Sequence, residues 1–139
     1  MLLPINDYET IGDIQERFNQ SFPYLKLEFF QKPHHFKAAS SEKLLISSEK
    51  RIGEIRKLHR NGELQIMSWY SVAKVESELK TVFGLNAQIF RKENNDWVQT
   101  SKTDIYTLHD QKDFARQASV SISSKWMNSQ VNMNTYKNG

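Results

Sequence analysis

Histidines and carboxylates are the residues of this sequence that could transfer protons or bind a metal ion, and their spacing favours neither role. His34 and His35 are adjacent, so in an extended segment they point to opposite faces and cannot readily share one ion. His109 precedes Asp113 by four residues, a spacing that allows a hydrogen bond on one helix face. The serines form no nucleophile elbow, and the five glycines form no phosphate loop. Because cysteine is absent too, we expect no catalytic residue, no metal site and no cofactor.

A second group of chemically useful side chains is a run of cations between residues 50 and 60. We expect a helix over residues 48–58, and its face would be locally positive although Glu49 and Glu54 interrupt it. Such a face could hold phosphates, with binding that depends strongly on salt. No aromatic platform of the RNA-binding type lies within the run. The candidate phosphate-binding residues are Lys50, Arg51, Arg56, Lys57 and Arg60.

The last 21 residues, 119–139, form a third candidate because their composition differs from the rest. They contain no acidic residue and two lysines, yet large apolar residues recur among the serines and asparagines. Val131, Met133 and Thr135 alternate as in a strand, which predicts docking on a sheet edge or in an apolar groove of this chain or a partner. The candidate partner-binding residues are Trp126, Met127, Val131, Met133 and Tyr136.

The elements that must position these residues follow from a repeat. At an offset of 61 residues Leu3 aligns with Leu64 and Phe22 with Phe83, and at an offset of 60 residues 25–30 align with 85–90. This spacing predicts two structural repeats, residues 1–60 and 61–118, followed by the tail 119–139. The alternative is that two amphipathic stretches look alike by chance.

Each predicted unit has the order strand, helix, strand, strand and a closing helix. The first strands are residues 2–5 and 64–67, and one-sided apolar stripes predict helices that start after Thr10 and Ser71 and end at Pro23 and Gly84. Alternating strands over 25–30 and 85–90 lead to turns, and short strands follow from Phe36 and Trp97. The closing helices are expected over 48–58 and from about residue 107. The predicted class is α+β with pseudo-twofold symmetry.

The stretch from Gly84 through Trp97, followed by Thr107-Leu-His-Asp-Gln, resembles a group of small uncharacterised bacterial proteins built from tandem βαβ-type units. The resemblance covers residues 61–112 and, more loosely, the first half. It implies a style of fold and no activity.

Composition limits the class of protein further. The net charge is +3, charged residues make up 25% of the chain, and no run of apolar residues is long enough to cross a membrane. The N-terminus lacks the basic and apolar regions of a signal peptide, so we expect a cytoplasmic protein. The favoured function is a non-catalytic protein-protein interaction or assembly module that binds another protein or itself. The alternative is a nucleic-acid-binding protein that uses residues 50–60, and a third class, a small hydrolase or ligand-binding protein, would need a deep polar pocket.

Overall fold

The computed structural model describes residues 1–33 and 42–119, and it combines helices with antiparallel sheets, which confirms the predicted α+β class. Residues 108–119 are helical up to the end of the described chain and are called helix 108–119 below. The other elements, in chain order, are β1 (Leu2–Ile5), α1 (Ile11–Ser21), β2 (Leu25–Phe29), the 3-10 turn η1 (Glu42–Leu44), α2 (Ile52–Ile55), β3 (Gly62–Gln65), α3 (Val72–Phe83), β4 (Ala87–Glu93) and β5 (Asp96–Gln99).

The strands form two separate sheets, and each sheet contains strands from both halves of the chain. β1 pairs with β3 in a two-stranded ribbon, while β2, β4 and β5 form a three-stranded sheet in that order. Residues that the sequence alignment equates lie opposite each other: Leu3 pairs with Leu64, and Glu28 pairs with Gln88. A twofold axis through each pairing would produce this register. The internal repeat itself stays a prediction.

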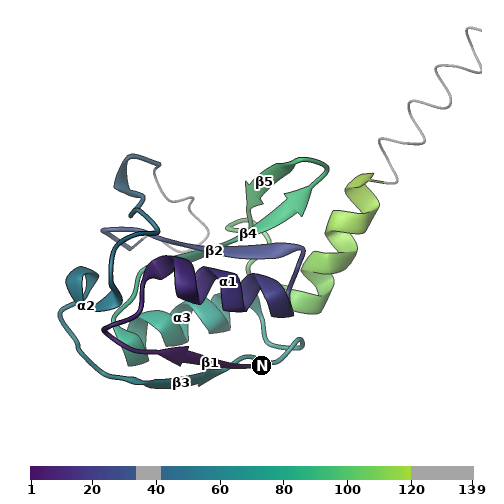
Figure 1. Cartoon of the computed structure of the whole chain (residues 1–139). Coiled ribbons are helices and arrows are strands. Elements are labelled where there is room, and N and C mark those ends of the chain that lie inside the picture. The colour runs from purple at the N-terminus through teal and green to yellow at the C-terminus, as the bar shows by residue number, and fades with distance from the viewer. Residues whose placement is uncertain (34–41, 120–139) are drawn as a thin grey trace, which may run out of the picture.

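The helices α1 and α3 lie between the two sheets, as Figure 1 shows, with the β1–β3 ribbon on one side and the larger sheet on the other. Alternation in β2 buries Leu25, Leu27 and Phe29 and leaves Lys26 and Glu28 partly exposed. Phe18 of α1 is fully buried in the same core. Burying such a side chain contributes about 2–3 kcal/mol, so this shared core is the main force that joins the two halves.

Helix ends agree with the predicted capping residues. Thr10 and Asp13 form a capping box at the start of α1, and the Ser71 hydroxyl accepts a hydrogen bond from the Lys74 amide at the start of α3. Gly84 ends α3 with φ of 68°, in the left-handed region that glycine adopts without steric cost.

Helix starts also contact each other in pairs through their backbones. The amide of Ile11 donates to the carbonyl of Lys50, and the amide of Ile52 donates to the carbonyl of Glu9, at 2.9 and 2.8 Å. The second half repeats this exchange: Val72 donates to Tyr106 at 3.1 Å, and Leu108 donates to Tyr70 at 3.0 Å. These bonds supply acceptors to amide groups that a helix start leaves unpaired.

A buried carboxylate likewise supplies a hydrogen-bond acceptor to a strand amide. Glu76 of α3 lies 7% exposed and accepts a hydrogen bond of 2.8 Å from the amide of Ile89 in β4. Further along, β4 turns into β5 through Asn94, whose φ of 57° suits the tight hairpin predicted there. The counterpart strand expected from Phe36 begins outside the described residues.

Within residues 1–33 and 42–119, no helix has the length and apolar character needed to cross a membrane.

Candidate functional site

The predicted basic helix is much shorter than expected. Helix α2 covers only Ile52–Ile55, and the backbone at Arg56 is extended, which corrects the helix predicted over 48–58. The physical reason is Arg56 itself, because its side chain is 0% exposed and turns inward to an ion pair with Asp7. The extended backbone at Arg56 directs this side chain toward Asp7 instead of along the surface of a longer helix.

Arg56 and Asp7 anchor a small polar network at this end of the molecule. The Arg56 Nε and Nη2 atoms lie 2.8 and 2.7 Å from Asp7 Oδ1, and Nη1 donates to the carbonyl of Phe83 at 2.9 Å. His59 Nδ1 donates to Asp7 Oδ2 at 2.9 Å, and Asn61 Oδ1 accepts from the Asp7 amide at 3.0 Å. These hydrogen bonds join residue 7, residues 56–61 and residue 83, so the network acts as a structural clamp.

The charge state of Asp7 is controlled by the same contacts. Burial by itself raises the pKa of Asp7, but the hydrogen bonds from Arg56 and His59 and the charges of these residues outweigh that effect and hold the pKa below its ordinary value. Asp7 therefore stays ionised as the permanent counter-ion of Arg56.

The remaining members of the basic cluster do not join Arg56 on one face. Lys50 lies 3.9 Å from Glu54 as an i,i+4 pair, and Arg51 donates to the carbonyl of Tyr8. Lys57 and Arg60 are exposed. Phosphate binding by this cluster stays a prediction, with Arg56 committed to internal partners.

Of the four histidines, the structure describes His59 and His109, and neither belongs to a group of potential metal ligands. The predicted His109–Asp113 contact is present at 3.7 Å, but both side chains are substantially exposed. No group of three potential metal ligands occurs in the part of the chain that the structure describes. His34 and His35 lie outside the described residues, as do the tail candidates Trp126, Met127, Val131, Met133 and Tyr136.

A groove runs along helix 108–119 and was not predicted from the sequence. We call it the Tyr24 groove. It consists of two hollows of about 280 and 430 Å³ that meet at Tyr24. Residues from the end of α1 and the start of β2 form one wall of the first hollow, and helix 108–119 forms the other; the apolar lining of that hollow is Phe22, Pro23, Tyr24, Leu25 and Leu108. Lys92, Asn94, Ala115 and Arg116 line the second hollow.

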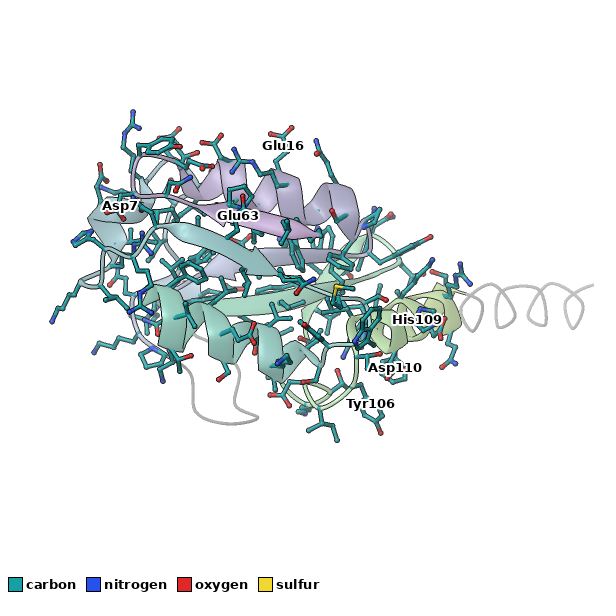
Figure 2. The ribbon with its side chains drawn as sticks, turned by 90° about the horizontal axis from the view of Figure 1, so that it is seen from below. Asp7, Glu16, Glu63, Tyr106, His109 and Asp110 are labelled. Atoms are coloured by element: carbon teal, nitrogen blue, oxygen red, sulfur yellow. The ribbon has the colours of Figure 1, made fainter. Side chains whose placement is uncertain are left out.

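Helix 108–119 is held firmly at its first turns. Thr107 and Asp110 form a reciprocal cap, with both hydrogen bonds at 3.0 Å. One turn later the buried Gln111 accepts from Arg91 Nη1 at 2.6 Å and donates to the Thr103 carbonyl at 2.7 Å. Figure 2 shows Tyr106, His109 and Asp110 together at this end of the molecule, away from Asp7. The groove wall is therefore fixed to β4.

The charges around the Tyr24 groove have one sign. Lys92, Lys112 and Arg116 line its hollows, and no carboxylate does so among the described residues. Lys112 Nζ lies 5.8 Å from the centre of the Tyr24 ring, a cation–π contact that places its charge at the junction of the two hollows. His109 also lines the first hollow. The groove thus joins an apolar floor to a cationic rim.

A second hollowed surface lies on the outer face of the larger sheet, and its charges are mixed. Lys26 Nζ lies over the rings of Phe90 and Trp97, at 5.3 and 5.0 Å from their centres, and pairs with Glu28 at 3.3 Å. Glu42 lines the hollow of about 410 Å³ on this face. The lysine here is already neutralised by a neighbour, which distinguishes this face from the Tyr24 groove.

Sequence reasoning missed the groove because four separate stretches of the chain build it, one of them the single residue Ser68. The other three stretches are residues 21–25, residues 92–94 and helix 108–119, and they come from both halves of the chain. The available signal was the spacing of Lys112 and Arg116, which puts both cations on one helix face one turn apart.

Comparison with protein-family models, with curated proteins and with solved structures finds no match to this chain. The resemblance to small bacterial proteins of tandem units stays a prediction.

Proposed function

We propose that this protein is a non-catalytic protein-interaction module that binds a peptide segment of its partner in the Tyr24 groove. The observation that supports the proposal is the pair of hollows along helix 108–119, which have a largely apolar lining and meet at Tyr24. Extended or helical segments commonly bind in grooves that offer apolar contacts beside a helix. We infer further that the protein acts in the cytoplasm.

The partly exposed Tyr24 ring supports this reading. Tyr24 is 38% exposed, and an aromatic side chain that is half in the groove can add buried area when a partner covers it. The first hollow, of about 280 Å³, is near the lower limit of ligand pockets, which suits one or two side chains of a peptide better than a large cofactor.

Selection from a random peptide display library against the full chain tests the proposal. A Ser21→Trp variant places a large ring at the first hollow, and Ser77→Trp is the matched control on the exposed surface of α3. We expect enriched peptides to bind the wild type and Ser77→Trp equally and to lose roughly tenfold or more in affinity for Ser21→Trp. Circular dichroism verifies that both variants are folded.

Two results would count against the function. Repeated selections that enrich no peptide would contradict it, and so would peptides that bind Ser21→Trp as well as they bind the wild type.

A further inference from the structure

The cationic rim of the Tyr24 groove consists of Lys92, Lys112 and Arg116, and its positive charge indicates the class of ligand that the groove binds. We propose that its occupant is an acidic amphipathic peptide segment of another protein, with an apolar side chain in the hollow beside Leu108 and carboxylates against Lys112 and Arg116. This inference rests on the function proposed above and deepens it.

The rim charges Lys92, Lys112 and Arg116 lack ion-pair partners among the described residues. Asp110 caps the helix at Thr107, Glu93 pairs with Arg91 at 2.5 Å, and the half-exposed Asp113 lies 3.7 Å from His109. A partner that brings carboxylates would therefore add ion pairs without breaking existing ones.

The chain's own tail does not have the charge that complements this rim. Residues 120–139 follow helix 108–119 in sequence and lie outside the described residues. They contain Lys125 and Lys137 and no aspartate or glutamate. Placing this segment along Lys112 and Arg116 would bring like charges together, whereas an acidic segment has the complementary sign.

A nucleic acid also carries negative charge, but the lining of the first hollow favours a peptide. Apolar side chains dominate the first hollow, where Phe22, Pro23, Leu25 and Leu108 offer contacts that a phosphate backbone cannot use. The Tyr24 ring is covered on one side by Lys112. An apolar pocket beside two cations matches a short sequence in which a large apolar residue is flanked by aspartate or glutamate.

The experiment measures binding of the display-selected peptides by fluorescence polarisation with the full-length protein. Each selected peptide is compared with a version in which every Asp and Glu is replaced by Asn or Gln. The double variant Lys112→Glu/Arg116→Glu is compared with Lys57→Glu/Arg60→Glu, which makes the same change in net charge on exposed residues far from the groove in sequence. A single-stranded RNA oligonucleotide is titrated in parallel.

If the inference holds, the selected peptides are net acidic and their neutral versions bind about tenfold more weakly. The Lys112/Arg116 variant loses about tenfold or more, the Lys57/Arg60 variant stays within about twofold, and binding weakens as salt rises from about 0.05 to 0.5 M. Groove-dependent peptides that are neutral or basic would overturn this inference and leave the interaction function standing.

Other outcomes separate the remaining explanations. Equal losses in the two charge variants would show non-specific attraction and overturn the inference. RNA that binds more tightly than any selected peptide and depends on Lys112 and Arg116 would assign the rim to nucleic acid instead. Failure of every groove-dependent selection would reject the proposed function itself, which distinguishes the two failures.

Discussion

At the scale of single residues, Arg56 shows how a buried charge depends on its acceptors. Its guanidinium is completely enclosed and contacts Asp7, Asn61 and the carbonyl of Phe83. Taking one partner from such a group leaves the others without compensation for the water they lost on folding. We therefore expect the contacts of the clamp to stabilise the protein together, so that the loss of Arg56 leaves its former partners without a donor.

Replacing Arg56 with Met should lower the free energy of unfolding by about 2–3 kcal/mol, because Asp7 and the Phe83 carbonyl then lose their donor. Asp7 remains about one-third exposed and can regain some water, which keeps the loss below that of a fully buried pair. Urea denaturation measures the change. Arg60→Met is the matched control, and since Arg60 is exposed we expect a change within about 0.5 kcal/mol. Equal losses in the two variants would refute the clamp.

The same variant gives a pH test with a definite sign. In the wild type the folded-state pKa of Asp7 is lowered, so the associated stability is present above the unfolded carboxylate pKa of about 3.9 and disappears as pH falls through the folded value. The stability gap between wild type and Arg56→Met should therefore be constant above about pH 5 and shrink in more acidic solution. A gap that stays constant down to about pH 3 would contradict the assignment.

The residue scale was also the hardest to predict. Apolar periodicity identifies Ile52 and Ile55 as inward-facing positions, and helical extrapolation then assigns Arg56 to the exposed side. The burial of Arg56 depends on Asp7, 49 residues away, and no local pattern reports such a pairing. By contrast, the cap of Thr10 with Asp13 is encoded within four residues, and the predicted helix start after Thr10 is confirmed.

At the scale of elements, the paired helix starts explain why a small residue stands at the second position of two of them. A Cβ atom built on Gly53 would lie 3.0 Å from the Cβ of Asp7, and one built on Gly12 would lie 3.3 Å from the carbonyl oxygen of Ser48. Each helix thus begins directly against the loop that precedes another helix. The close approach, rather than an unusual φ, is what the glycines allow.

We expect Gly53→Ala to destabilise the protein by about 1 kcal/mol. Crowding in a packed site costs about 1–3 kcal/mol, and the reduced entropy of the unfolded chain returns about 0.4–1 kcal/mol. Thermal melting and urea denaturation measure the effect. Gly62→Ala serves as control, because its Cβ would meet the Phe83 ring at an ordinary 3.5 Å. A Gly53→Ala variant as stable as the wild type would show that the loop at Asp7 yields easily.

Element type was largely readable from the sequence, and element length less so. Alternation identified β2, one-sided stripes identified α1 and α3, and the turn predicted between strand 85–90 and Trp97 is present at Asn94. The predicted helix over 48–58 was too long. Ile52, Ile55 and Leu58 have helical spacing, but only the turn Ile52–Ile55 forms and Leu58 is exposed. The length of α2 is decided by the tertiary contact of Arg56.

At the scale of the whole molecule, the two halves are interlocked by their strands. Within the described region β1 pairs only with β3, and β2 pairs with β4. Each sheet therefore contains strands from both halves of the chain. The domain limits 1–60 and 61–118 stay predictions. The Tyr24 groove also contains residues of both halves, so the sequence pattern of one half does not predict it.

A fragment of residues 1–60 should not fold alone, because it would expose the core residues of β1, α1 and β2. We expect weak secondary structure by circular dichroism and a collapsed, poorly dispersed NMR spectrum. Mixing it with residues 61–139 should restore the native spectrum in a one-to-one complex, seen by light scattering. A cooperative thermal transition in the isolated monomeric fragment would contradict the interlocked arrangement.

The pairing of Leu3 with Leu64 also has a consequence for the order of events during synthesis. β1 leaves the ribosome before its partner β3 has been translated, so this native contact is distant in sequence. Folding is therefore expected to be slow for a chain of this size. During that interval the edges of β1 and β2 can pair with another copy of the same chain. An exchanged dimer, in which each chain donates its first half to the other, is the misassembly to which this topology is most exposed.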